Sequence, residues 1–261
     1  MYESELVRAA VNAIAAHISK LHVETKGAAR PSLQAKLKKG PNEFQTWSQF
    51  LYRTSTILDV NNTAFIVPVM DKALRTTGYY PILPQRATVV EYRGEPWLQY
   101  EFTNGQRAAV EMKRCSVLTR FQYRNDFFGS SNKALDETMD LITVQNQGIE
   151  EGVKNSASFR FMATVNNFAK AEDLRKERAK FVAENLGPDS GGLALFPNTY
   201  TNVQQIQSTA KIVDPDQLKL IQDRVYTYFG SNEKILHNEA AGDAWAAYYE
   251  GKIEPFALQL S

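Results

Sequence analysis

The chain has 261 residues, with 30 Lys and Arg against 29 Asp and Glu, so its formal net charge is +1. Charged residues make up 23% and hydrophobic residues 43%, which are ordinary globular values and exclude a disordered, collagen-like or membrane-spanning chain. The balanced charge also argues against a basic protein that coats nucleic acid. A single cysteine, Cys115, excludes an intrachain disulfide and indicates synthesis in a reducing cytosol.

Two amphipathic helices are predicted near the N-terminus. Residues 4–21 carry apolar side chains at three- and four-residue spacing, and Ser4 is the expected N-cap. A polar loop is expected at residues 26–31. The second helix is predicted to begin at Asn42, because Gln45 three residues later completes a capping-box pattern.

The next segment has the alternation of β-strands. Asn61-Asn62 is a turn signal, and the apolar residues 64–67 after it predict a buried strand. Between 79 and 121 the period is two, which predicts a β-meander with strands at 88–92, 97–102 and 107–112. The Asn104-Gly105 pair between the last two strands is a strong hairpin signal, because a type I′ turn needs two residues with positive φ.

A long helix is predicted at residues 131–155, where the apolar stripe is thin and the other faces are polar. Such a helix needs neighbours to hold it. A second helix is marked by Asp214 as N-cap, Pro215 at its first position and Gly230 as its stop. Between the two helices the pattern predicts a small α/β insertion, with a strand at 158–165, a charged helix at 171–186 and strands at 192–196 and 200–207.

The C-terminal part begins with a polar stretch at 231–243 and continues as an aromatic helical segment at 245–260. Pro255 is expected to interrupt this helix. No helix stop precedes Ser261, so we expect the natural protein to continue beyond this residue.

One pair of motifs imitates a serine protease. Ala15-Ala16-His17 and Asp189-Ser190-Gly191-Gly192 have the order of the His and Ser motifs of the chymotrypsin family. However, His17 lies inside a predicted helix, Ser190 lies in a polar turn, and the chain lacks a cystine framework. Because a triad is defined by geometry rather than by motif fragments, helix and turn roles are the preferred interpretation.

Metal and phosphate sites are equally weak. His17, His22, His237 and Cys115 show no zinc-ligand spacing. Residues 129–131, Gly-Ser-Ser before a helix, resemble an anion cradle but lack the P-loop pattern, so N-capping is the preferred role. We therefore predict no catalytic residue, no metal and no cofactor, and we expect that the chain is not an enzyme.

Several short segments occur in one order along nearly the whole chain. They are an alanine-rich helix at 9–21, Pro41-Asn42 before 47–50, Asn61-Asn62 before 63–66, Arg124-Asn125-Asp126 with 128–131, Asp216-Gln217-Leu218 leading to Tyr228-Phe229-Gly230, and Ala247-Tyr248-Tyr249 with 253–256. Their order and spacing resemble the phage portal protein family of tailed phages of the HK97 type. Two positions depart from that family, because Asn61 replaces a usual Gly and Ser231-Asn232 replaces a customary Val-Pro.

The resemblance implies an α+β portal-type fold. Its parts would be an α/β wing at 1–130, a first stem helix at 131–157, a small α/β clip at 158–212, a second stem helix at 213–229, a tunnel loop at 230–243 and the start of a kinked wing helix at 244–261. The crown of the family would be absent from this sequence.

The implied function is structural. A dodecameric ring at one capsid vertex would be the channel for DNA packaging and ejection, and the chain would be a virion protein assembled in the host cytoplasm. The implied partners are further copies of the chain, double-stranded DNA bound without sequence specificity, the terminase, the major capsid or scaffolding protein and a head-tail adaptor, with no membrane. The residues expected to face the DNA channel are Ser231, Asn232, Lys234, His237 and Asn238 of the loop, and Gln145, Gln147, Lys154, Lys219 and Gln222 of the stem.

Each of these residues has an alternative role at the solvent surface or between subunits. Two other functions also stay open at this point. One is a ring-forming phage protein without DNA in its lumen, and the other is a soluble enzyme whose site is not recognised.

Overall fold

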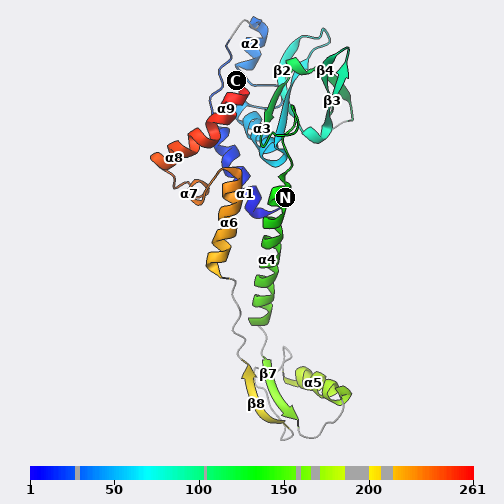
Figure 1. The fold of residues 1–261 in the computed structure, drawn as a ribbon, viewed down its shortest axis with the longest axis vertical. Helices are drawn as coiled ribbons and strands as arrows, with labels where there is room; N and C mark the ends of the chain where they lie inside the picture. Colours follow the sequence, from blue (N-terminus) through cyan, green and yellow to red (C-terminus); the bar gives the residue numbers. More distant parts are fainter. Residues whose placement is uncertain (27–29, 103–104, 157–159, 166–170, 186–199, 207–213) are drawn as a thin grey trace. The chain divides into compact units, whose positions relative to one another are not determined.

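The computed structural model describes residues 1–261 except 27–29, 103–104, 157–159, 166–170, 186–199 and 207–213. The chain divides into two compact units, one made of residues 1–141 and 219–261 and the other of residues 142–218 (Figure 1). Helices and strands are both present in each unit, so the predicted α+β class is confirmed. The boundaries of wing, stem, clip and loop stay predictions.

The first unit begins with helix α1 (Glu5–Ile18), which the periodicity predicted. Its apolar stripe is fully covered, and the buried residues are Val7, Ala10, Val11, Ile14, Ala15 and Ile18. Ser4 occupies the N-cap as predicted, but its side chain makes no capping hydrogen bond. Helix α3 (Trp47–Asn61) packs against α1 and carries its own buried side, which includes Phe50 and Leu51.

The predicted start of the second helix at Asn42 is wrong. The cap of α3 is Thr46, whose hydroxyl accepts from the backbone N–H of Gln49 while the Gln49 side chain accepts from Thr46 N–H. Asn42 is used elsewhere, because its amide donates to the carbonyl oxygen of Tyr79 at 2.8 Å. A contact between residues so far apart in the chain has no local sequence signal.

Helix α2 (Pro31–Leu37) was not predicted, because in its seven residues only Leu33 and Leu37 repeat at helical spacing, and Leu37 is the one buried residue in it. Pro31 occupies the first helical turn, where its missing N–H costs nothing. The Trp47 indole N–H of α3 donates to the Leu37 carbonyl at 2.8 Å, and α2 also contacts β2, so the rest of the unit holds α2 in place.

Two antiparallel three-stranded sheets complete the core of this unit. The predicted meander is confirmed as β3 (Ala87–Tyr92), β4 (Glu95–Glu101) and β5 (Arg107–Glu111), in the order β3-β4-β5. The strand predicted after Asn62 is β1 (Thr63–Met70), and it lies between β2 (Thr76–Ile82) and β6 (Ser116–Thr119) in a second sheet. Splitting the alternating region into two sheets was not predicted. The buried residues shared by the two sheets are Phe65, Val67, Ile82, Leu98, Tyr100, Val110 and Met112.

Two consecutive residues with positive φ, as in a type I′ turn, occur between β3 and β4, whereas the predicted pair was Asn104-Gly105. Arg93 and Gly94 between β3 and β4 both have positive φ, at 54° and 79°. Gly105 has a φ of 80°, and its partner Asn104 lies outside the described residues.

The chain returns from β6 to the next helix through a crowded crossing at Gly129. A Cβ atom at this position would lie 2.1 Å from the Arg120 carbonyl oxygen and 2.2 Å from that of Asn62, so only glycine fits. The N–H of Gly129 donates to the Thr63 hydroxyl, and the N–H of Ser130 donates to the Phe121 carbonyl. Two of the three N–H groups of residues 129–131 are therefore committed to the fold, which argues against an anion cradle here.

The long helix predicted at 131–155 is present as a 3₁₀ turn (Asn132–Leu135) followed by α4 (Asp136–Ser156). The helix predicted from 214 is α6 (Pro215–Phe229), and Asp214 accepts from the N–H of Asp216. The ends of the two helices in the first unit are joined, because the Tyr228 hydroxyl donates to the Asn132 side-chain oxygen at 2.7 Å.

The second unit contains most of α4, the start of α6, and an insertion between them. Strands β7 (Arg160–Val165) and β8 (Tyr200–Ile206) pair antiparallel, with α5 (Ala171–Asn185) between them in the chain. These elements confirm the predicted strand, helix and last strand. The strand predicted at 192–196 lies outside the described residues.

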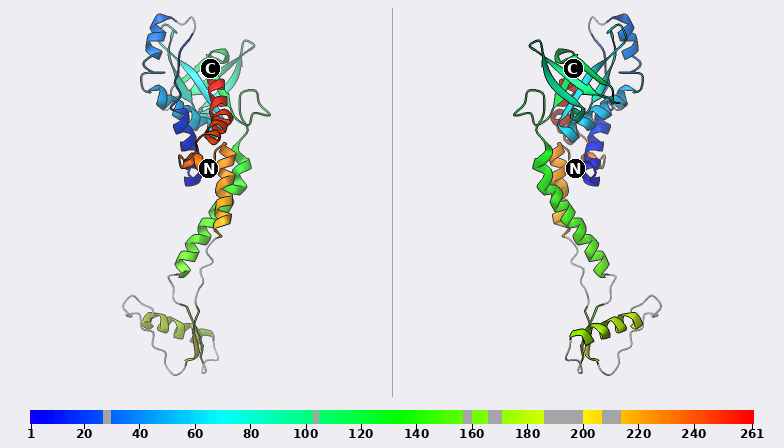
Figure 2. Two further views of the ribbon diagram at one scale, coloured as in Figure 1. Left: turned by 90° about the vertical axis from the view of Figure 1, so that its left-hand side faces the viewer. Right: turned by 90° about the vertical axis from the view of Figure 1, so that its right-hand side faces the viewer.

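The first unit closes with the C-terminal segment. Helix α8 (Asp243–Tyr248) passes through a π-helical turn (Tyr249–Ile253) into α9 (Glu254–Leu260). The predicted interruption at Pro255 takes this form because a proline inside a helix supplies no N–H and its ring crowds the preceding turn. Figure 2 shows α9 beside the strands of this unit, where the Gln259 side chain bonds the backbone of Thr119 in β6.

Candidate functional site

The polar segment after α6 begins at a defined helix stop. Gly230 has a φ of 75° and its N–H donates to the Thr227 carbonyl, while the N–H of Ser231 donates to Tyr226 at 2.8 Å. This pair of bonds is a Schellman motif, which only a residue tolerating positive φ completes easily. The predicted stop at Gly230 is therefore confirmed.

The segment itself contains a short helix, α7 (Glu233–Leu236), where an irregular loop was expected. Asn232 caps it, because its side-chain oxygen accepts from the N–H of Ile235 at 3.1 Å. The Ile235 side chain is buried and packs this helix onto the unit. The segment is thus attached to the rest of the unit at its middle.

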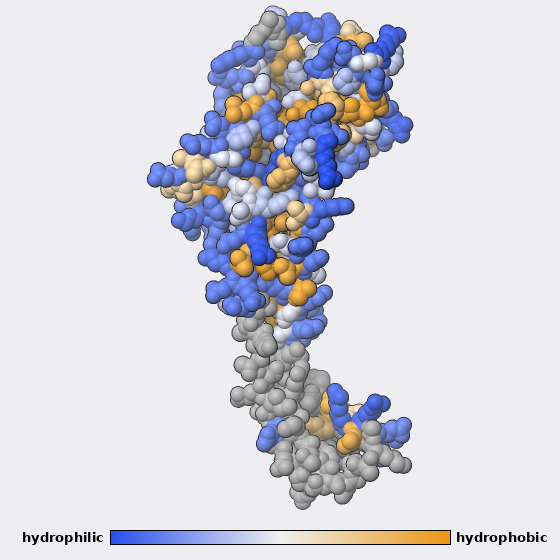
Figure 3. Space-filling view, viewed as in Figure 1, coloured by the Kyte–Doolittle hydropathy of each residue, from blue (hydrophilic) through white to orange (hydrophobic). Residues whose placement is uncertain are grey.

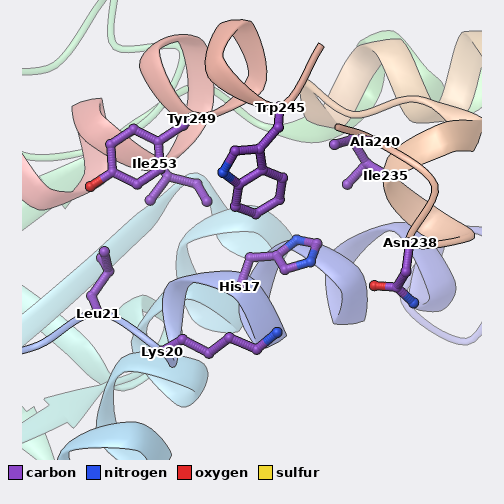
Figure 4. A pocket seen from close by; sticks show the side chains of 9 residues that line it. All are labelled: His17, Lys20, Leu21, Ile235, Asn238, Ala240, Trp245, Tyr249 and Ile253. Atoms are coloured by element: carbon purple, nitrogen blue, oxygen red, sulfur yellow. The ribbon is translucent and has the colours of Figure 1, made fainter. Parts of the chain in front are cut away.

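A second attachment comes from α1. His17 makes edge-on ring contacts with Trp245 and Tyr248, with centroids 5.0 and 5.7 Å apart, and its Nδ1 lies 3.4 Å from the Tyr248 hydroxyl. Figure 4 shows the His17 ring between Trp245 and Asn238, at a cleft of about 360 Å³. Burial lowers the pKa of His17, the Lys20 ammonium lowers it further, and a hydrogen bond with Asn238 opposes the shift.

These contacts argue against His17 as the histidine of a serine protease. His17 lies in α1 and its ring is occupied by aromatic neighbours, as expected of a helix residue. Ser190 and the motif around it lie outside the described residues. Among the described residues, no group of three or more His, Cys, Asp or Glu side chains is arranged to hold a metal ion.

The predicted channel residues of the loop differ in exposure. Asn232, Lys234, His237 and Asn238 are exposed, whereas Ser231 is only 8% exposed. The exposed residues among those predicted offer one ammonium group, one imidazole and two amides to a partner, and the same segment also exposes the carboxylates of Glu233, Glu239 and Asp243.

The predicted stem residues lie on two helices. On α6, Gln222 is exposed, and the Lys219 ammonium lies 3.6 Å from the Glu233 carboxylate. On α4, Gln147 is exposed, Gln145 is half-buried, and Lys154 forms an ion pair with Glu150 one turn earlier. The structure brings Lys219 next to the loop through Glu233, and it assigns the three α4 residues to the other unit.

A buried ionic cluster was not predicted. Asp59 on α3 accepts from Arg120 Nη1 at 2.6 Å and from Lys252 Nζ at 2.7 Å, both at the same oxygen. The three side chains are 2%, 15% and 14% exposed. Burial lowers the pKa of Lys252, and the Asp59 carboxylate counteracts this shift. The one sequence signal for this cluster was a lone acid, Asp59, in the apolar end of α3, directly after Ile57 and Leu58.

Two further properties bear on the class of protein. Burial raises the pKa of the Cys115 thiol to about 11, so this cysteine carries little of the nucleophilic thiolate form. Within the part of the chain that the structure describes, no helix combines the length and apolar composition needed to cross a membrane.

Comparisons with known proteins agree with one another. The family model described as phage portal protein matches residues 5–261. The neck of an empty GTA particle has a chain 14% identical at a TM-score of 0.71, covering 99% of this chain and 75% of that chain. The virion of a native gene transfer agent particle has one that is 13% identical at 0.71, covering 100% and 76%.

An HK97 family phage portal protein from Corynebacterium diphtheriae is 14% identical at a TM-score of 0.58, covering 99% of this chain and 85% of that one. At such identities the likeness establishes the fold. No curated protein sequence matches the chain.

Proposed function

The chain belongs to the phage portal protein family, and from this premise we propose that it forms a ring at one capsid vertex through which double-stranded DNA enters and leaves the particle. The observation that carries the proposal is the family match over residues 5–261. The family is structural and non-enzymatic, which confirms the prediction that the chain is not an enzyme and excludes a soluble enzyme with an unrecognised site.

Helix α4 supports the ring. None of residues 136–154 is buried, although this stretch carries Leu141, Val144 and Ile149, which are 44%, 65% and 39% exposed. Figure 3 shows apolar side chains at the surface over α4 and over α6. Apolar side chains at helical spacing gain by being covered, and neighbouring copies in a closed ring would cover them. The neck of a related GTA particle was computed with C12 symmetry, and we propose twelve copies here.

The exposed residues of the loop are the proposed DNA-facing surface. Lys234 and His237 would approach phosphates, and Asn232 and Asn238 would donate hydrogen bonds to them. Ser231 is left out of this surface because its side chain is buried. Contacts to phosphates carry no sequence information, and few positive charges on the loop keep salt-dependent affinity low, which suits DNA that has to move.

The remaining partners follow from the family. We propose that the unit containing β7, α5 and β8 docks the terminase during packaging and a head-tail adaptor afterwards. The β-rich part of the first unit would face the major capsid or scaffolding protein. The Gln145, Gln147, Lys154, Lys219 and Gln222 side chains stay candidates for the channel wall.

Imaging the purified chain tests the ring. Closed rings with a central hole are expected, and a population of monomers over a wide concentration range would contradict the proposal.

Charge reversal tests the DNA-facing loop. Lys234→Glu should reduce the DNA packaged into particles assembled with the variant, because the new carboxylate repels phosphates. Lys72→Glu is the matched control, since Lys72 is an exposed lysine in the turn between β1 and β2. If both variants package DNA like the wild type, the loop does not face DNA, and a ring with a different lumen function would be favoured.

A further inference from the structure

The cluster of Asp59, Arg120 and Lys252 joins three parts of the first unit that are far apart in sequence. Asp59 comes from α3, Arg120 follows β6, and Lys252 lies in the π-helical turn before α9. Both cations bond the same carboxylate oxygen, while the second oxygen has no partner among the described residues. The cluster borders a cleft of about 300 Å³.

Its two cations hold the two ends of the loop segment 230–252. At the start, Arg120 Nη2 donates to the Tyr228 carbonyl in the last turn of α6 at 3.1 Å. At the end, Lys252 bonds the carboxylate, and its Cδ lies 3.3 Å from where a Cβ on Gly230 would stand. The start and end of the segment therefore meet at one buried carboxylate.

The kind of contact changes along this segment. Its middle is attached by the apolar Ile235 and by the rings around His17, while the Lys219–Glu233 ion pair there is exposed to solvent and so contributes little. Apolar contacts tolerate small displacements, because the hydrophobic effect is non-directional. Buried ionic contacts tolerate them poorly, because a buried charge that moves away from its partner loses attraction that water does not replace. The base of the segment is thus the place where its position is most narrowly defined.

We propose that Asp59 is a positioning residue, which through Arg120 and Lys252 fixes the base of the loop segment 230–252 and so places its exposed groups at a constant distance from the α3–β6 framework. The value of a fixed position for Lys234 rests on the proposed DNA-facing role of the loop. The positioning itself is a property of the single chain and is measurable without DNA.

The test compares backbone hydrogen exchange in variants of the full chain. Asp59→Asn removes the charge and leaves two buried cations uncompensated, so it is a severe change. The triple variant Asp59→Leu, Arg120→Met, Lys252→Met removes all three charges and replaces them with apolar groups of similar volume, which folded proteins often tolerate. Lys252→Arg keeps the charge and should behave like the wild type.

The readout is the protection of the amides at 235–240, which are hydrogen-bonded within the segment. A helix as short as α7 does not persist without its attachments. In the triple variant we expect these amides to exchange roughly tenfold faster or more, while amides of α1 and β1 keep their rates. The matched control is Arg53→Met on α3, because Arg53 bonds the Tyr80 hydroxyl and not this segment.

Three results would overturn the proposal. Unchanged protection at 235–240 would show that the apolar contacts alone position the segment. A uniform loss of protection across the unit, or failure of the triple variant to fold, would make the cluster a requirement of the whole core. Because none of these measurements involves DNA, a wild-type packaging result for Lys234→Glu would leave the positioning role standing and remove only its purpose.

Discussion

Helices α1 and α4 have the same kind of amphipathic sequence pattern, but the apolar side of α1 is buried and that of α4 is exposed. Helix α1 has 14 residues, and six of them are buried against α3, α7 and the π-helical turn. Helix α4 has 21 residues, yet none of residues 136–154 is buried. An amphipathic pattern thus states that a helix has an apolar side, but not whether its own chain covers that side. For α1 the cover is internal, and for α4 we propose that it comes from other copies.

The largest expected effect is on assembly. The double variant Leu141→Asp, Val144→Asp places two carboxylates on one face of α4, because positions three apart lie together on a helix. Burying those charges between copies would be far too costly, so rings should be lost entirely. Light scattering and particle images measure this. The melting temperature of the separated chain should change by less than about 2 °C.

Asn146→Asp is the control for that variant. It adds a carboxylate to another exposed side of the same helix. Rings should persist in this control, and rings that persist in the double variant would place the subunit contacts elsewhere than α4.

The next effect is on the core of the first unit. Phe65 is fully buried in β1 and packs edge-on against Phe128, with ring centroids 5.3 Å apart. Phe65→Ala should lower the free energy of unfolding by about 3–5 kcal/mol, since it removes buried area and leaves a cavity. The matched change on α4, Val144→Ala, should alter the free energy of unfolding of the separated chain by less than about 0.5 kcal/mol. Denaturant titration measures both, and equal costs would contradict the comparison.

A smaller effect is expected where backbone meets backbone at Gly129. Gly129→Ala brings a Cβ within 2.2 Å of two carbonyl oxygens, so the crossing between β6 and α4 has to shift. The cost should be about 1–3 kcal/mol of unfolding free energy. Gly251→Ala is the control, because a Cβ there meets no described atom within 4 Å. If the two variants have the same free energy of unfolding, the backbone at the crossing shifts more easily than the short Cβ distances indicate.

The sequence predicted the elements whose signals are local. The stop at Gly230 depends on one backbone conformation, and helices α1, α4 and α6 depend on a period that any window reveals. The start of α3 was misplaced because Asn42 looks like a cap but bonds the carbonyl of Tyr79, 37 residues away. The sequence alone does not show whether such a residue caps a helix or bonds a distant part of the fold.

The same limit applies to the candidate site. The polarity of residues 231–243 was enough to predict an exposed segment, yet not that Ser231 and Ile235 are buried within it. The Asp59 cluster unites residues from three distant stretches, and in sequence each of its cations looks like an ordinary surface charge. Buried ion pairs are therefore found only when the packing is known.

The smallest expected effect is a pH dependence of the free energy of unfolding, which comes from His17 in α1. Burial lowers the pKa of His17 below its ordinary value of 6.5, so the folded chain resists protonation at this ring. As the pH falls through 6.5, the unfolded chain takes up a proton that the folded chain does not, and the free energy of unfolding decreases. The decrease continues until the pH passes the folded pKa and then stays constant. Because the ring is only half-buried and solvent screens it, the total should be below about 1 kcal/mol.

Urea titrations between about pH 7.5 and about pH 5 detect this contribution as a difference between variants. His17→Gln should lose less stability on acidification than the wild type, because its side chain has no proton to exclude. His22→Gln, which removes an exposed imidazole just after α1, is the matched control. If His17→Gln and the wild type have parallel pH profiles, the ring is not shielded by Trp245 and Tyr248 in solution. The internal cover of α1 would then be looser at this end than along its buried stripe, and α1 and α4 would differ by less than their burial indicates.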